Sequence, residues 1–130
     1  MGQPAAKEND QIVAVDTHII LIPTPGGPVP TPIPNPFSGL IDGELSSDVK
    51  IMGLAAATEG SKATNTPSHI PMGGPFQSPP SNEATIDMGS QTVKINGKAA
   101  ARMGDTATTC NDPADAPVGT VVAAGTVLIG

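Results

Sequence analysis

The chain repeats part of itself, and this internal repeat constrains its fold more than any other feature. Residues 46–64 read SSDVKIMGLAAATEGSKAT and residues 90–108 read SQTVKINGKAAARMGDTAT, so eleven of nineteen positions are identical at an offset of 44. A third, shorter copy, residues 125–130 (GTVLIG), matches only the first strand of the unit. Repetition of this kind reports a structural unit that the chain uses more than once.

Each copy has the pattern of a β-hairpin. Residues 93–95 (VKI) alternate apolar and polar side chains, Asn96-Gly97 is a favoured two-residue turn, and residues 99–103 supply a return strand. A type I′ turn needs positive φ at both central residues, which Asn and Gly tolerate. The first copy has Met52-Gly53 at this place. Since methionine rarely adopts positive φ, we expect that hairpin to turn differently.

The residues around the turns are small. Alanines fill positions 55–57 and 99–101, and the whole chain has two aromatic residues, Phe37 and Phe76. Little side-chain bulk lets neighbouring strands approach a crowded axis, which favours a close-packed, tapering β structure.

Two proline-rich stretches separate the repeats, residues 23–36 with seven prolines and residues 67–80 with five. Alternating prolines exclude helix and hold the chain extended. One interpretation is a flexible linker or a polyproline ligand for an SH3-like partner. Against it, Phe37 and Phe76 lie at these stretches, and large apolar groups in a loop usually anchor it to the core.

The fold class follows from length and pattern. A chain of 130 residues is long enough for one domain, residues 1–130, with a real core. Residues 118–129 are aliphatic and β-branched and predict a strand pair or hairpin. No stretch shows a helical period of useful length. We therefore predict an all-β domain of short hairpins with little or no helix.

Composition argues against several classes of function. A net charge of −6 is opposite to what a nucleic-acid phosphate backbone attracts. The apolar run 19–22 is far shorter than the ~20 residues that span a bilayer. The polar, acidic first ten residues do not resemble a secretory signal, so we expect synthesis and assembly in the cytoplasm.

Three residues could carry chemistry, His18, His69 and the single cysteine, Cys110. Their spacings match no contiguous zinc-finger pattern, and a lone histidine or cysteine is often structural. Similar repeat units around one axis would nevertheless bring similar positions together, and thiolate with imidazole suits zinc. A cysteine hydrolase would use the same atoms, but no local signature supports one. Asp112 and Asp115 could suggest calcium, although a solvated turn explains them more simply.

A family resemblance joins these features. Residues 93–97 (VKING), the segment Lys98-Ala99-Ala100-Ala101-Arg102, Gly104-Asp105 and the closing GTVLIG resemble the PAAR-repeat proteins, with Ala99 at the place of the proline. The resemblance extends from about residue 12 to the last glycine. Residues 9–19 and the long proline-rich insert resemble the branch found with phage-tail-like contractile injection systems.

This resemblance implies a cone of short hairpins with pseudo-threefold symmetry. Such a domain caps a trimeric VgrG-like spike protein, one copy per trimer, at the piercing tip of the injection particle, and it can accompany effector cargo. The family holds zinc near the apex with three histidines and one cysteine, so His18, His69 and Cys110 match the ligands. This chain has two histidines. The fourth place is left to water or to an oxygen of Asn35, Asp16 or Asp112, or the site has three ligands or none.

Two further functions stay open from the residues alone. The first is a Pro-rich adaptor that recruits a non-spike partner through residues 23–36. The second is the small Cys/His hydrolase. The resemblance implies neither of them and predicts a non-enzymatic structural tip.

Overall fold

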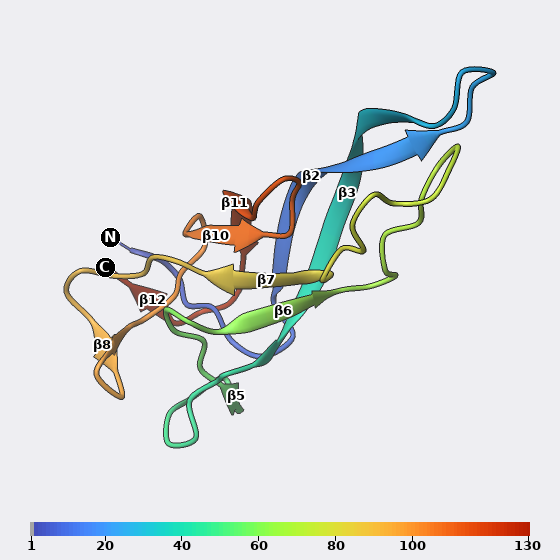
Figure 1. The fold of residues 1–130 in the computed structure, drawn as a ribbon. Coiled ribbons are helices and arrows are strands. Elements are labelled where there is room, and N and C mark those ends of the chain that lie inside the picture. The colour runs from blue at the N-terminus through green and yellow to red at the C-terminus, as the bar shows by residue number, and fades with distance from the viewer. Residues whose placement is uncertain (1) are drawn as a thin grey trace.

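The computed structural model describes residues 2–130, and these form an all-β domain, as the sequence predicts. An elongated body carries a long two-stranded projection at one end, while both chain ends and the smallest hairpins lie at the other (Figure 1). Among the described residues, no helix has the length and apolar character needed to cross a membrane. The strands are β1 (Gln3–Pro4), β2 (Gln11–Ile22), β3 (Val29–Gly43), β4 (Lys50–Ile51), β5 (Leu54–Ala55), β6 (Lys62–Asn65), β7 (Glu83–Ile86), β8 (Lys94–Ile95), β9 (Lys98–Ala99), β10 (Thr106–Thr109), β11 (Ala116–Val122) and β12 (Leu128–Ile129).

Six strands close into an antiparallel barrel in the order β10-β11-β2-β3-β6-β7. The remaining strands form three small hairpins, β4 with β5, β8 with β9, and β12 with β1. Each hairpin lies between two barrel strands that are themselves paired: β3 and β6, β7 and β10, β11 and β2. The chain therefore builds the same hairpin-and-strand unit three times, and we call the end with the three hairpins the wide end.

The third hairpin is assembled from the two ends of the sequence. Gln3 pairs with Ile129 and Pro4 pairs with Leu128, so residues 3–10 (QPAAKEND) supply the return strand that residues 54–61 and 98–105 supply in the other units. Sequence analysis found only the first strand of this copy. Its prediction of a strand pair within residues 118–129 is wrong, because β12 pairs with β1, whereas β11 joins the barrel.

Three alanines hold the units together around a pseudo-threefold axis. The N–H of Ala6 donates to the carbonyl of Ala101, the N–H of Ala101 to Ala57, and the N–H of Ala57 to Ala6, with N···O distances of 2.9 to 3.1 Å. All three side chains are fully buried. A larger side chain would push the three backbones apart, so the small residues are required by this cyclic set of hydrogen bonds.

The same turn follows the axis in every unit. A side-chain oxygen accepts the backbone N–H three residues before it: Asp10 from Lys7, Ser61 from Thr58, and Asp105 from Arg102. The residue before each acceptor has positive φ, which Gly60, Gly104 and Asn9 can adopt. Each turn leads directly into a barrel strand, so β2, β6 and β10 start from equivalent positions.

The first hairpin does not turn differently, contrary to expectation. Met52 and Gly53 have φ values of 53° and 86°, close to the 53° and 81° of Asn96 and Gly97. The tertiary structure overrides the local preference of methionine: a Cβ atom on Gly125 of the neighbouring unit would lie 2.7 Å from the Met52 sulfur, so this side chain packs on bare backbone.

Strands β2 and β3 extend beyond the barrel as a projection that we call the arm, residues 17–36. Their pairing runs without a break from Gln11–Leu40 to Ile22–Val29. The proline-rich residues 29–36 are thus extended, as predicted, but they are part of a paired strand and not a free linker or polyproline ligand. Phe37 follows them and is buried in the core, whereas Phe76 is half-buried and bridges to Ile20 on the arm.

The close packing of the alanines at the axis gives a first prediction. Ala101→Val adds two methyl groups where three backbones meet, so it should lower the free energy of unfolding by about 1–3 kcal/mol. The matched control is Ala114→Val, at an exposed alanine, which should change it by less than about 0.5 kcal/mol. Urea denaturation of both variants measures the difference, and equal stabilities would contradict the packed axis.

Candidate metal centre

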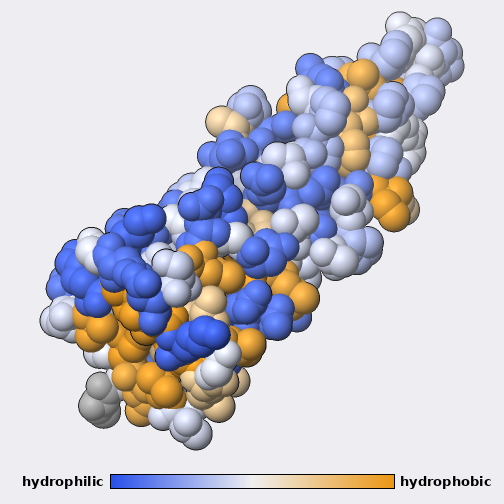
Figure 2. Space-filling model, turned by 90° about the horizontal axis from the view of Figure 1, so that it is seen from below, coloured by the Kyte–Doolittle hydropathy of each residue, from blue (hydrophilic) through white to orange (hydrophobic). Residues whose placement is uncertain are grey.

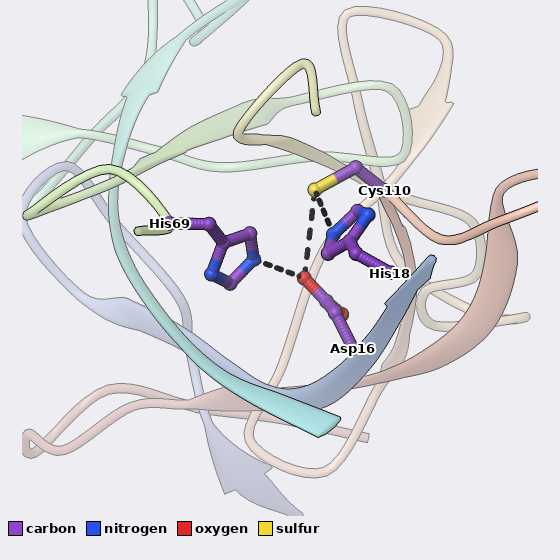
Figure 3. A group of neighbouring side chains, drawn as sticks. All are labelled: Asp16, His18, His69 and Cys110. Carbon is purple, nitrogen blue, oxygen red and sulfur yellow. Dashed lines mark hydrogen bonds and ion pairs between the residues drawn. The ribbon is translucent and has the colours of Figure 1, made fainter. Parts of the chain in front are cut away.

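Four side chains that can bind a metal converge where the arm leaves the barrel. They are Asp16, His18, His69 and Cys110, and one ligand atom from each lies within 4.8 Å of the others (Figure 3). Asp16 and His18 are two residues apart on β2 and therefore point to the same face. His69 lies in the segment after β6, and Cys110 directly follows β10.

The threefold pattern explains this convergence. His18, His69 and Cys110 lie on or just after β2, β6 and β10, the three strands that start from equivalent turns. Each of the three units therefore contributes one side chain, on or just after its barrel strand, to the cluster. A fourth donor must come from outside the pattern, and Asp16 is a second residue from β2.

The distances suit a small tetrahedral site. Asp16 Oδ2 lies 2.9 Å from His69 Nε2 and 3.5 Å from Cys110 Sγ, and Sγ lies 3.7 Å from His18 Nε2. Zinc at its usual bond lengths holds tetrahedral ligand atoms about 3.3–3.6 Å apart. Small side-chain rotations would bring all four atoms to these separations.

The cluster is closed off from solvent by the only two aromatic residues. The side chains of His18, His69 and Asp16 are 1%, 2% and 0% exposed. The Phe76 ring meets His18 edge-on with centroids 5.8 Å apart, and Phe37 lies 6.1 Å from His69 in the same manner. Phe37 thus anchors its segment to the core, as expected, whereas Phe76 packs against Ile20 and His18 on β2, and each ring contacts one histidine of the cluster.

Two neighbouring residues, Thr109 and Asp112, contact Asp16 and His18 on the side away from the centre of the cluster. The hydroxyl of Thr109 donates to Asp16 Oδ1, which leaves Oδ2 for the centre of the cluster. His18 Nδ1 is buried with no hydrogen bond to the described residues, and Asp112 Oδ2 lies 3.6 Å away from it. Histidines that bind a metal commonly direct the other ring nitrogen toward a carboxylate. The position of Asp112 therefore fits a metal on His18 Nε2.

The hydrogen bonds of His69 place its ring proton on Nε2, the nitrogen that faces Asp16. The Asn65 amide nitrogen lies 3.2 Å from His69 Nδ1, so Nδ1 accepts and Nε2 donates to Asp16. A cation between Nε2 and Asp16 would replace this proton. Metal binding at the cluster must therefore release protons and weaken as the pH falls.

Burial shifts the ionisation of two of the ligands. Loss of hydration, then the charge of Asp16, raises the pKa of the Cys110 thiol to about 11. Loss of hydration, then the neighbouring His69, lowers the pKa of His18 below its ordinary value. At neutral pH the metal-free cluster thus holds a neutral imidazole at His18 and a protonated thiol, which a bound cation would deprotonate.

The other candidate oxygen ligands differ in their surroundings. Asn35 is buried opposite Asp16 in the strand pairing, and its amide nitrogen donates to the Ile33 carbonyl. Asp112 lies behind His18, where it accepts the Ile19 N–H at 2.8 Å, and Asp115 is exposed. Sequence analysis did not identify Thr109 or Asn65, because a threonine and an asparagine in a β pattern carry no signal that distinguishes them.

Fold and cluster together define an all-β domain that folds three like units from one chain around a buried group of potential metal ligands. The PAAR motif family model matches residues 21–114, most of the chain. The protein belongs to the PAAR motif family. None of the curated proteins compared with the chain matched it.

The raised pKa of Cys110 gives the second prediction. A thiol that titrates at about 11 in the folded protein and near its ordinary 8.5 when unfolded stabilises the fold below that value, and this contribution is lost as the pH rises through the folded pKa. Metal-free protein should therefore lose about 3 kcal/mol of stability between pH 8 and 11. Denaturant titrations with a chelator measure it. Cys110→Ser, which does not titrate there, should lose less, and equal pH profiles would contradict the assignment.

Proposed function

We propose that this protein is the structural tip of a contractile injection particle, where it caps a trimeric VgrG-like spike and helps it penetrate the target envelope. Membership of the PAAR motif family supports the proposal. The observation that carries it is the cyclic hydrogen bonding of Ala6, Ala57 and Ala101, which gives one chain the symmetry of a three-chain partner.

The geometry of the wide end suits this docking. A trimeric shaft ends in three equivalent strand edges, and an exposed edge readily pairs with another chain. Three hairpins in one chain offer three equivalent surfaces to such edges. We therefore infer a stoichiometry of one copy per spike trimer, with the wide end against the shaft and the arm leading.

We infer that the buried cluster holds one zinc ion through Cys110, His18, His69 and Asp16. A metal here would link strands from all three units where the barrel narrows and apolar contacts are few, which is a structural cross-link. The carboxylate of Asp16 and the thiolate of Cys110 together balance the charge of a divalent cation. A neutral group costs less to bury than a net charge, which favours a carboxylate as the fourth ligand of a site this dry.

A structural role explains the chemistry of the cluster better than catalysis does. A nucleophilic cysteine has a lowered pKa and access to substrate. Cys110 has a raised pKa and is 3% exposed. The adaptor hypothesis is disfavoured because residues 29–36 pair with β2 along their length. We propose assembly in the cytoplasm, followed by delivery at the particle tip.

The third prediction concerns the metal. Purified protein should contain about one zinc per chain, and Cys110→Ser or Asp16→Ala should lose most of it and lower the melting temperature by roughly 10 °C. Elemental analysis and calorimetry measure both effects. Asp115→Ala removes an exposed carboxylate as a control and should change neither. Stoichiometric metal retained by Asp16→Ala would exclude that residue as a ligand.

The fourth prediction concerns docking. Leu128→Glu puts a charge on an exposed side chain of the third hairpin, so it should weaken binding to the spike trimer about tenfold or more. Val118→Glu places the same charge on an exposed valine of the barrel wall and should change binding less than about twofold. Mass photometry gives the stoichiometry, and three bound copies per trimer would refute the capping model.

A further inference from the structure

Arg102 links the second unit to the turn of the third hairpin. Its guanidinium pairs with Asp105 at 2.9 Å. It also donates to the carbonyl of Gly89, in its own unit, at 3.5 Å, and to that of Gly130, in the next unit, at 3.1 Å. A basic side chain thus fills the space between the loop before one hairpin and the turn of its neighbour.

Lys7 takes the same place in the third unit. It stands at the position of Arg102 in the repeat, since it follows the third axial alanine, Ala6, as Arg102 follows Ala101. Its ammonium pairs with Asp10 at 3.1 Å and donates to the Ala124 carbonyl at 2.7 Å. Two of the three units therefore place a basic side chain of the chain itself at this position.

The first unit has a cavity at this position. Thr58 stands 44 residues before Arg102, and Ser61 stands 44 residues before Asp105, so the ion pair is replaced by two short neutral side chains. Thr58 is 3% exposed and lines a cavity of about 250 Å³ between the loop before β4 and the turn of the β8–β9 hairpin. The other residues that line the cavity are Glu44, Leu45, Ser46, Ser47, Asn96 and Lys98.

The backbone acceptors for a basic side chain are still present in the first unit. Leu45 corresponds to Gly89 in the repeat and Ser46 corresponds to Ala124, and the carbonyls of Gly89 and Ala124 accept from the basic side chains of their units. Within residues 2–130, the lysine and arginine side chains that donate hydrogen bonds all donate elsewhere. The cavity therefore has the acceptors of the other two units without the cation.

The charges around the cavity also differ from those of the second unit. Residues 44–61 carry three carboxylates and one lysine, whereas residues 88–105 carry three basic residues and one carboxylate. Glu44 lines the cavity, and the Asn96 amide beside it donates to Asp48 at 2.7 Å. Lys98 is the one basic residue of the lining. Where the chain lacks its own cation it thus has an excess of negative charge, which attracts a cation from outside.

We propose that this cavity, which we call the cation site, binds a guanidinium or ammonium group, and that a basic side chain of the spike supplies it. This inference rests on the proposed capping role and specifies what one spike chain contributes. The site is at the wide end, where dark blue hydrophilic atoms border orange apolar ones (Figure 2). A trimer presents the same side chain three times, but Arg102 and Lys7 already fill the place in two units. The first unit alone can receive one.

The fifth prediction tests the chemistry of the cation site with a small probe. Ethylguanidinium should bind at least about fivefold more tightly than ethylurea, its neutral analogue, because a charged donor makes stronger hydrogen bonds. Magnetic resonance of isotope-labelled protein should show shifts at Ser46, Ser47 and Asn96. Thr58→Arg fills the site from within and should abolish them, whereas Ala114→Arg adds the same charge at an exposed position and should not. Equal binding of both probes, or binding of neither, would overturn the proposal.

Spike binding distinguishes a partner side chain from a free small cation. Thr58→Arg should weaken binding to the spike trimer about fivefold or more, and Ala114→Arg should change it less than about twofold. Glu44→Gln, at an exposed position, should weaken the binding of both spike and ethylguanidinium, which keeps the test valid if Thr58→Arg does not fold. Unchanged spike affinity in Thr58→Arg and Glu44→Gln would refute the spike as the source.

Lys98 provides a last control, because its ammonium lies at the cavity. Lys98→Gln should tighten spike binding by removing the opposing charge. If it instead lowers the melting temperature of the free protein and abolishes the difference between the two probes, Lys98 itself fills the site and the proposal fails. The stoichiometry of the unaltered protein on the trimer tests capping separately. Capping by one copy with no effect of Thr58→Arg or Glu44→Gln would therefore overturn this inference and leave the proposed function intact.

Discussion

The fold depends on one physical constraint, the meeting of three backbones at a single axis. Ala6, Ala57 and Ala101 exchange hydrogen bonds in a ring, and their methyl side chains are fully buried. From this ring each unit follows the same path through a side-chain-capped turn into a barrel strand. The ring thereby determines that three strands start in register and that residues far apart in sequence converge above them. The metal cluster is a consequence of this geometry.

The number of repeat units is three, whereas a tetrahedral metal site needs four ligands, and one additional residue of the chain makes up the difference. Three units supply three donors, but a tetrahedral cation takes four. Asp16 offers a fourth donor from the same strand as His18, in a group of side chains with almost no solvent exposure. Phe37 and Phe76 exclude water from the two imidazoles. Both phenylalanines of the chain therefore contact the cluster, and Phe37 is also part of the hydrophobic core.

Several features could be predicted because their signals are local or repeated. The hairpin at Asn96-Gly97 follows from turn chemistry, the extended course of residues 29–36 from proline, and the repeated unit from self-comparison. Two predictions were wrong because distant contacts decide them. Met52 adopts the strained turn since its side chain packs on Gly125, and β12 pairs with β1 since the third unit is split between the chain ends. Residues 3–10 did contain the signal, as QPAAKEND, but the alanine-rich copies obscured it.

The sequence by itself determined the class of fold and the repeated unit, because residue types and their spacing carry that information directly, whereas His18, His69 and Cys110 were matched as candidate ligands through the resemblance to the PAAR-repeat proteins. Only the tertiary structure shows that Asp16 lies with these three residues and that Asp112 lies behind His18, since this depends on which face of β2 is buried and on the course of the chain after β10. The same holds for the arm. Its prolines are visible in the sequence, but the strand register alone shows that they lie opposite Thr17, Ile19 and Leu21 and remove every donor from that edge.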